Sequence, residues 1–296
     1  MPGCLRTFTV VIPVYNEIDA LRHTVPALLD GLPPGARLVY VCNGCSDSSA
    51  DFLRSITDNR LRVLETPRAS KTLALAMGEE AEPGFPRFFL DADVLVSGAV
   101  LAQLADLLGK ADVELVSPRL TFDYGGASLL ARKANEVWLS LPHGEQGSFQ
   151  QVIGVNRQGR ARWGAMPEVT ADDSFIAAQV PTERRHKAIN LAACVRPPDT
   201  LPALFGTRLR ILKGLAELEA MGIERPRAPG QKTALRRALL TRRTMPGALA
   251  YIATGLAARA AFTLGVGRKG WYRDTSSRRS FAKTSPSSHD KQDSTR

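Results

Sequence analysis

Short apolar runs alternate with helical patterns through the first 120 residues of the chain. The first run, residues 7–13, is followed by apolar positions at helical spacing over residues 18–29. The same alternation continues, with strands predicted at residues 37–42, 62–65, 87–90 and 113–117 and helices at residues 46–56, 72–80 and 99–108. Strands separated by single helices are typical of a mostly parallel sheet with helices on both faces. The pattern therefore predicts an α/β fold.

The pattern loosens beyond residue 120, where fewer elements can be placed. Those that can are helices at residues 127–141, 204–221 and 232–243, a strand at 151–155 and a loop at 158–167. An apolar segment follows at Met245–Gly267, but it is rich in alanine and glycine and is interrupted by Arg259. Residues 274–296 are rich in Ser, Arg and Lys with little to bury, so we expect them to be disordered.

Charge divides the chain into two unequal parts. The 296 residues carry a net charge of +10, with 44% hydrophobic and 23% charged residues, as in a folded globular protein. Residues 1–205 carry a net charge of about −3 and residues 206–296 about +13. The positive charge therefore belongs to the C-terminal third. The near-neutral remainder argues against nucleic-acid binding over most of the surface.

The cysteines indicate a reducing compartment. The four of them, Cys4, Cys42, Cys45 and Cys194, are too few for a disulfide scaffold in a chain of this length. No charged start, apolar run and small-residue cleavage site precede the first strand, so we expect a cytoplasmic protein. Cys42 and Cys45 form a C-x-x-C pair, a spacing found in redox and zinc sites. Because no second pair lies at ligand spacing, we favour Cys42 as a buried strand residue.

Unusual polar residues follow three of the predicted strands. They are Asn16 and Glu17, the segment 43–47, and the pair Asp91 and Asp93. In open parallel sheets, ligand-binding groups gather at the carboxyl ends of the strands. We therefore expect three loops, far apart in sequence, to meet at one edge of the sheet.

Carboxylates and a lysine near this edge indicate phosphate and metal chemistry. Asp91 and Asp93 stand one residue apart after an apolar strand, where a divalent cation such as Mg²⁺ or Mn²⁺ would offset their repulsion. A helix cap followed by a solvated acid is the alternative. Lys71, at the start of a helix, could meet a phosphate through its ammonium group or could simply be solvated.

Two further polar segments each have a functional and a plain interpretation. Segment 43–49, Asn-Gly-Cys-Ser-Asp-Ser-Ser, is suited to holding a base or ribose, or to forming a turn and a helix cap. Asp172 and Asp173 precede an apolar helical turn and are either caps or the source of a general base for a hydroxyl nucleophile.

Taken in order, these motifs resemble a known family. The succession is residues 11–17 (Val-Ile-Pro-Val-Tyr-Asn-Glu), 43–47, Ser70-Lys71 with 74–78, Asp91-Ala92-Asp93 and Asp172-Asp173. In order and spacing it is similar to glycosyltransferase family 2, over roughly residues 7–215. The resemblance implies a GT-A fold, which is a Rossmann-like nucleotide-binding half joined to an acceptor-binding half. It implies inverting transfer of a sugar from a nucleotide diphosphate to a hydroxyl acceptor, with Mg²⁺ or Mn²⁺ as cofactor.

The resemblance also assigns roles to individual positions. For donor binding it gives Pro13, Tyr15, Glu17, Asn43, Asp47, Lys71, Asp91 and Arg210. Asp93, with Asp91, would hold the metal, and Asp173 would be the catalytic base beside Asp172. Asn43 stands where many members have an aspartate that reads the base. Thr207 to Ile211 departs from the Q-x-x-R-W motif of processive members, with only Arg210 in common, which argues against processive polymerisation.

The resemblance implies an organisation of the whole chain. We expect a catalytic domain at residues 1–205, made of a nucleotide-binding half (1–120) and an acceptor half (121–205), then a basic, apolar helical extension at 206–273 and a tail at 274–296. The extension is either a membrane-surface segment, which would suit a lipid-linked acceptor in envelope or exopolysaccharide synthesis, or a helix pair of the core. The alternative functions are nucleotidyl transfer to a sugar phosphate and non-catalytic binding to a membrane surface.

Overall fold

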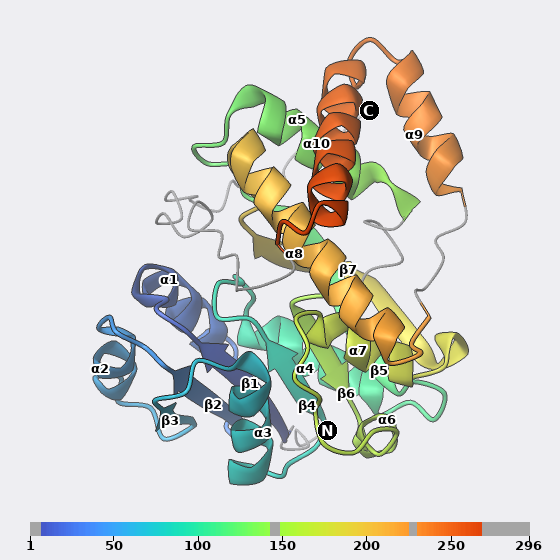
Figure 1. Ribbon diagram of the computed structural model, residues 1–296. Coiled ribbons are helices and arrows are strands. Elements are labelled where there is room, and N and C mark those ends of the chain that lie inside the picture. Colours follow the sequence, from blue (N-terminus) through green and yellow to red (C-terminus); the bar gives the residue numbers. More distant parts are fainter. Residues whose placement is uncertain (1–6, 143–148, 225–229, 268–296) are drawn as a thin grey trace, which may run out of the picture.

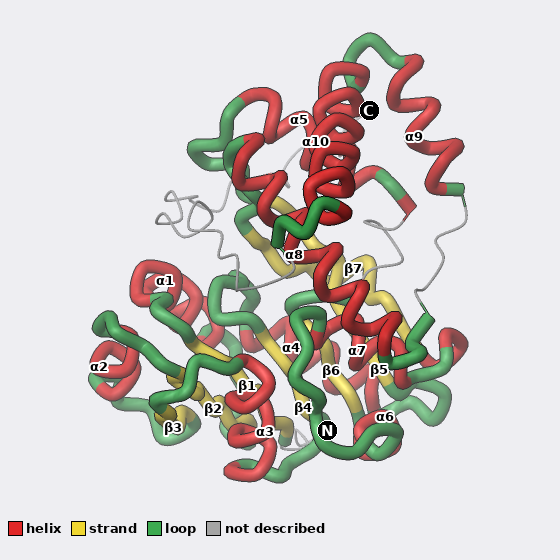
Figure 2. Tube along the Cα trace, viewed as in Figure 1, coloured by secondary structure: helices red, strands yellow, loops and turns green. Residues whose placement is uncertain are grey.

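A single seven-stranded sheet forms the centre of the protein (Figures 1 and 2). The computed structural model describes residues 7–142, 149–224 and 230–267. The strands are β1 (Phe8–Val14), β2 (Ala36–Asn43), β3 (Leu61–Thr66), β4 (Arg87–Leu90), β5 (Leu115–Phe122), β6 (Val152–Val155) and β7 (Arg185–Val195). Their order in the sheet is β3-β2-β1-β4-β6-β5-β7. The α/β prediction is confirmed.

The first four strands are parallel, and the direction changes at β6. β6 runs antiparallel to both of its neighbours, pairing Leu90 of β4 with Val152 and Leu115 of β5 with Val155. β7 then adds to β5 in parallel. β6, which follows β5 in the sequence, is thus inserted between β4 and β5. This insertion brings the end of β4 beside the start of β6.

Helices cover both faces of the sheet, as the alternation predicted. They are α1 (Ile18–Leu29), α2 (Ser49–Arg54), α3 (Lys71–Ala81), α4 (Gly98–Leu108), α5 (Leu129–Ser140), α6 (Arg157–Arg160), α7 (Asp172–Gln179), α8 (Leu201–Ala220), α9 (Gln231–Leu240) and α10 (Met245–Thr263). On β1, Val10 and Ile12 belong to the core shared with α1 and α4, whereas Val11 belongs to the core shared with α3 and α7. This period of two is that of a strand buried on both faces.

One strand and one short helix were not predicted. β7 begins with polar residues, Arg185, His186 and Lys187, and lies at the edge of the sheet, so its sequence lacks a buried-strand pattern. α6 is a single turn within the segment expected to be a loop. The predicted tail at 274–296 lies outside the described residues.

The C-terminal helices pack on α5 and on one another. α10 contacts α5, α8 and α9, and Figure 1 shows α5, α9 and α10 gathered at one end of the molecule, with β1 to β3 at the other. In the part of the chain that the structure describes, no helix has the length and apolar character needed to cross a bilayer.

Candidate active site

The loops after β1 and β2 are joined by side-chain hydrogen bonds. Asn16 adopts a positive φ of 53°, which asparagine tolerates better than most residues. Its Oδ1 accepts hydrogen bonds from the backbone N–H of Ser46 at 2.6 Å and of Asp47 at 3.2 Å. Glu17, which is buried, donates its backbone N–H to Ser49 Oγ at 2.9 Å. The predicted meeting of these two loops is therefore present.

Asn43 and Asp47 brace these same loops. The buried Asn43 amide donates to the carbonyl of Val14 at 2.8 Å and so ties β2 to the end of β1. Asp47 accepts from the backbone N–H of Ile18 at 3.2 Å, which places its charge at the N-terminus of α1. Both residues lie at the predicted edge, with side chains that hold the scaffold.

Lys71 connects the end of β4 to the start of α7. Ser70 caps α3 by accepting from the N–H of Leu73, so Lys71 opens the helix at the sheet edge. Its Nζ lies 2.8 Å from Asp91 Oδ1 and 2.9 Å from Asp172 Oδ2. Burial lowers the pKa of Lys71, but the Asp172 and Asp91 carboxylates outweigh it and raise that pKa above its usual range. The lysine therefore stays charged.

A small cavity lies beside Lys71, Asp91 and Asp172. Its lining includes Pro13, Lys71, Asp91, Gln151, Asp172 and Asp173. These six come from β1, α3, the end of β4, the start of β6 and α7. The structure thus brings together five of the residues predicted from sequence.

Asp173 is the third carboxylate in the lining of this cavity. Its Oδ1 accepts from the backbone N–H of Ser174 at 2.6 Å. Burial, with the neighbouring Asp172 charge, raises the pKa of Asp173 to about 6, although Lys71 opposes the rise. Burial also raises the pKa of Asp172, which Lys71 lowers in part. A carboxylate with a pKa near 6 is ionised at neutral pH and still basic enough to accept a proton.

α8 positions these two carboxylates. The Glu217 carboxylate accepts from the backbone N–H and the hydroxyl of Thr170, at 2.6 and 3.1 Å, just before α7. Gly214 allows close approach, because a Cβ there would lie 2.7 Å from Cβ of Ala171. A bulkier residue at 214 would push the start of α7 away from α8.

Asp93 is half-buried and shares its environment with Arg210 of α8. Burial raises the pKa of Asp93 to about 6, and Asp91 adds to the rise, whereas Arg210 and Lys71 oppose it. Arg210, predicted from a weak motif, therefore acts electrostatically on the predicted metal ligand. Tyr15, which is half-buried, and Glu17 lie farther along the edge in the loop after β1.

The residues present fit a divalent cation completed by its substrate. Within residues 7–142, 149–224 and 230–267, no three His, Cys, Asp or Glu side chains are arranged to hold a metal ion. Mg²⁺ is commonly held by one or two carboxylates together with substrate phosphates, and Asp91 and Asp93 offer that donor set. Burial and the neighbouring Asp91 charge raise the pKa of Asp93, and Arg210 and Lys71 oppose that rise only in part.

Gln151 is a site residue that the sequence analysis did not identify. Its backbone carbonyl accepts from the N–H of Asp91 at 2.9 Å, and its φ is +61°. Its Oε1 is buried with no hydrogen-bond partner, and the residue lines the cavity. The available signal was a polar residue directly before a short apolar strand, but only the β4–β6 pairing shows that this position faces Asp91.

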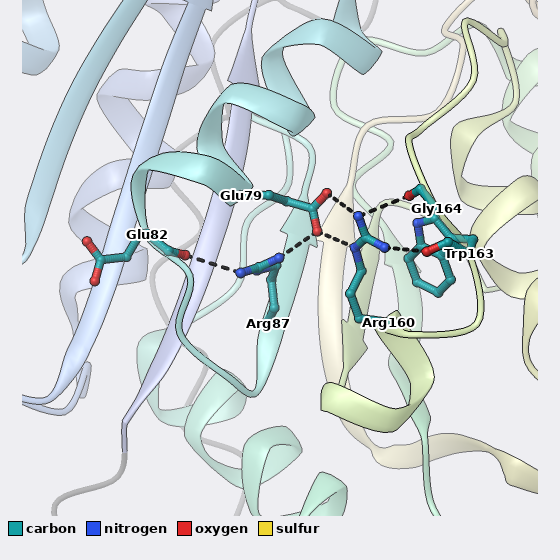
Figure 3. A network of polar contacts seen from close by, with 6 residues as sticks. All are labelled: Glu79, Glu82, Arg87, Arg160, Trp163 and Gly164. Carbon is teal, nitrogen blue, oxygen red and sulfur yellow. Dashed lines mark hydrogen bonds and ion pairs between the residues drawn. The ribbon is translucent and has the colours of Figure 1, made fainter.

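An ion network centred on Glu79 of α3 links the elements that carry the site. Glu79 accepts from Arg87 at 2.6 Å and from Arg160 at 2.6 and 3.1 Å (Figure 3). Arg160 also donates to the carbonyls of Trp163, at 2.7 Å, and Gly164. The network joins α3 and β4 to the segment that leads from β6 to α7. It therefore fixes the path of the chain toward Asp172.

The predicted C-x-x-C pair takes part in packing. The sulfur of Cys45 lies 3.4 Å from the backbone N of Asn16 and from the carbonyl of Val14. Cys42 is buried in β2, and both are free thiols. A side-chain hydrogen bond with Cys45, together with burial, raises the pKa of Cys42, which is the reverse of an activated thiol.

Comparison with known proteins agrees with this geometry. The sequence profile of "Glycosyl transferase family 2" matches residues 9–164, which is more than half of the chain and includes β1 to β6. The chain belongs to glycosyltransferase family 2. The family's name describes glycosyl transfer. Membership therefore favours glycosyl transfer over nucleotidyl transfer and over a purely non-catalytic module.

Solved structures of other glycosyltransferases share the fold. A mannosyltransferase from Pyrobaculum calidifontis, in complex with GDP-Man and Mn²⁺, is 23% identical with a TM-score of 0.57, covering 87% of this chain and 79% of that one. S. aureus TarS, residues 1–349, is 14% identical with a TM-score of 0.52, covering 90% and 93%. Glucosyl-3-phosphoglycerate synthase from Mycobacterium tuberculosis, solved with Mn²⁺ and UDP-glucose, is 17% identical with a TM-score of 0.52, covering 74% and 81%. These likenesses confirm the GT-A fold.

A curated relative matches only part of the chain. The uncharacterized glycosyltransferase YibD of Escherichia coli is 22% identical over 144 residues, which is 48% of this chain and 40% of YibD. The chain thus aligns with less than half of this relative's length.

Proposed function

We propose that this family 2 enzyme is an inverting, metal-dependent transferase that moves a hexose from a nucleotide diphosphate to a hydroxyl acceptor. The observation that carries the proposal is the cluster of Lys71, Asp91 and Asp172 with Asp173 beside it. One cation and one basic carboxylate thus belong to the lining of the same cavity. Transfer in a single displacement requires a charge partner for the departing diphosphate and a base for the attacking hydroxyl.

Each residue then has a defined task. Asp173 accepts the acceptor proton as the hydroxyl oxygen attacks the anomeric carbon and the bond to the diphosphate breaks. Lys71 offsets the charge that grows on the diphosphate. Asp172 holds Lys71, and the unpartnered Oε1 of Gln151 accepts a hydrogen bond from a sugar hydroxyl. Asp91 and Asp93 would hold Mg²⁺ or Mn²⁺, which supplies further electrostatic stabilisation of the diphosphate.

The nucleoside is proposed to lie along the β1 and β2 loops. Pro13, Tyr15 and Glu17 would line its pocket, while Asn43 and Asp47 keep the two loops together. Arg210, which acts on Asp93 from α8, is proposed to take part in donor binding. The support is the position of these loops at the carboxyl edge of the sheet.

A panel of nucleotide sugars tests the proposal. UDP-, GDP- and dTDP-sugars are incubated with the enzyme, with and without Mn²⁺, and release of nucleoside diphosphate is measured. We expect slow hydrolysis of one donor with Mn²⁺ and none with a chelator. Equal release with and without metal would contradict the metal assignment, and release of none would contradict the donor class.

We also propose a domain division and a setting. The catalytic domain would be residues 1–205, with halves at 1–120 and 121–205, followed by the extension at 206–273. The acceptor is proposed to be a lipid-linked hydroxyl of envelope or exopolysaccharide synthesis, reached at the inner face of the cell membrane. The basic extension supports this setting. Transfer to a lipid-linked acceptor, compared with a soluble sugar of the same structure, tests it.

A further inference from the structure

One face of α10 exposes a continuous apolar stripe. Its members recur at three- and four-residue spacing and are Met245, Leu249, Ala253, Leu256, Ala260 and Leu264, which follows the helix end. Leu249 is 52% exposed, Leu256 59% and Leu264 85%. At 100° per residue these positions fall within about a 100° arc, which is one side of a helix. Large side chains are therefore left in water along the length of α10.

The opposite face of α10 fixes the orientation of this stripe. Ala248 and Ala258 are fully buried where α10 packs on α5 and α8. Gly247 sits so close to α5 that a Cβ would lie 2.3 Å from the carbonyl oxygen of Lys133. The guanidinium of Arg208 lies 4.1 Å from the Tyr251 ring centre, which joins α8 to α10. The helix cannot rotate to bury its leucines without breaking these contacts.

The charged side chains of α9, α10 and the turn between them are all positive. Residues 225–273 contain no Asp or Glu. α9 packs against α10 and exposes three basic side chains, and the turn between the helices exposes two more, which together are Lys232, Arg236, Arg237, Arg242 and Arg243. Arg259 is exposed beside the stripe. We call this set, with the stripe, the α9–α10 face.

We infer that the α9–α10 face docks on an anionic lipid bilayer, with α10 lying in the plane of the interface. An apolar stripe flanked by Lys and Arg is the composition of helices that bury one side at the acyl boundary while cations meet anionic headgroups. A nucleic acid would use the cations and leave the leucines in water. A second copy of the chain would have to bring equal positive charge against these same cations, which repel. Of these three partners, the anionic bilayer alone both covers the apolar stripe and balances the positive charge.

Flotation with vesicles tests this inference on the full chain. Vesicles of phosphatidylcholine with phosphatidylglycerol are compared with phosphatidylcholine alone. We expect binding to the anionic vesicles that weakens as salt rises. The variant Leu249→Gln/Leu256→Gln should bind at least about tenfold more weakly, because two inserted side chains are lost. Arg236→Gln/Arg237→Gln should weaken binding by a similar or larger factor, since each basic residue contributes.

Matched variants separate this surface from general effects. Ile189→Gln changes an exposed apolar residue on β7, and Arg37→Gln/Arg54→Gln removes two exposed cations elsewhere. Both should float like the unmodified chain, and circular dichroism should show all variants folded. Unchanged flotation of the leucine variant would overturn the inference, because binding would then be electrostatic alone. Vesicle-independent binding to duplex DNA, or a dimer dispersed by the leucine variant, would also overturn it. None of these readouts depends on transferase activity, so failure of the proposed reaction leaves the test intact.

Discussion

Adjacent aspartates at the start of α7 are given different roles by one lysine. Asp172 Oδ2 lies 2.9 Å from Lys71 Nζ, so the Asp172 carboxylate pairs with the lysine and holds it beside Asp91. Asp173 accepts a hydrogen bond from the backbone N–H of Ser174, and burial and the Asp172 charge raise its pKa to about 6. Asp172, whose charge is paired with Lys71, positions that lysine, whereas Asp173 is suited to receive a proton.

Replacing Asp173 by Asn should abolish transfer with little change in donor binding. The amide has nearly the same shape but cannot take a proton, and a positioned base typically contributes about 10²–10⁴ in rate. Transfer rates and calorimetric titration with the nucleoside diphosphate check both parts. Asp51→Asn, at a side chain that is 82% exposed, is the matched control. Transfer within about tenfold of the unmodified enzyme would show that another group is the base.

The rate of transfer should depend on pH with an apparent pKa near 6. Asp173 acts as a base only when ionised, so the rate should be level above pH 7 and fall as pH drops through 6, reaching about one tenth at pH 5. Initial rates at saturating donor and metal, from pH 5 to 8, measure this dependence. A profile that is flat across this range would contradict the assignment.

Asp93→Ala should remove the metal dependence of donor binding. The variant loses a carboxylate next to Asp91, so Mn²⁺ should no longer strengthen binding of the nucleoside diphosphate. Titrations with and without Mn²⁺ measure the difference, and Asp106→Asn on α4 serves as control. Retained Mn²⁺ enhancement in Asp93→Ala would place the metal elsewhere.

Local sequence indicated which residues carry chemistry but not which of them touch. Asp91 and Asp93 were identifiable because acids directly follow a buried strand, and Lys71 because it opens a helix. The pairing of Lys71 with Asp172 joins positions about one hundred residues apart, and no spacing reveals it. Gln151 was missed for the same reason. Its approach to Asp91 follows from the antiparallel β4–β6 pairing, which strand patterns alone do not specify.

At the scale of elements, the strands buried on both faces and the short edge strand β3 were readable, whereas the opposite edge strand, β7, was not. β1, β2 and β4 are apolar runs bounded by turns, and they were located within about two residues. β7 has one neighbour in the sheet and mixes Arg, His, Lys and Asn with small apolar residues. Its pairing with β5 also shifts register between Pro118 and Arg119, which breaks any simple alternation.

The ion network of Figure 3 should matter for stability because it is buried. Glu79 is the shared acceptor of Arg87 and Arg160, and its side chain and that of Arg87 are 9% and 5% exposed. Glu79→Ala leaves two cations without their partner and should cost about 3–5 kcal/mol of unfolding free energy. Urea denaturation measures this cost. Glu80→Ala, on the exposed side of the same helix, should change it by less than about 0.5 kcal/mol.

At the scale of the whole molecule, the C-terminal helices are part of the packing around α5. α10 lies against α5 and α8, and α8 in turn positions Asp172 through Glu217. The sequence predicted these helices and their charge but left open whether they pack on the core, because composition does not show which face is covered. Its buried side is made of small residues, Gly247, Ala248 and Ala258, which carry a weak hydrophobic signal.

Shortening the chain to residue 230 should therefore destabilise it. Removing α9 and α10 uncovers the faces of α5 and α8 that α10 packs against, and the thermal midpoint should fall by about 5 °C or more. A chain ending at Gly267, which keeps α10, is the matched control. Differential scanning calorimetry compares the two. An equal midpoint would show that the rest of the chain does not need α9 and α10 for its stability.

The insertion of β6 between β4 and β5 has a consequence for engineering. Because the ladder partner of Leu90 is Val152, the residues before and after position 120 share one continuous hydrogen-bonded sheet and have no seam between them. Chimeras that exchange acceptor specificity among relatives cannot be cut at residue 120 and rejoined as modules. Crossover points that leave β6 with its native neighbours, and replace only the loops around it, are the ones that preserve the alignment of Asp91 with Gln151.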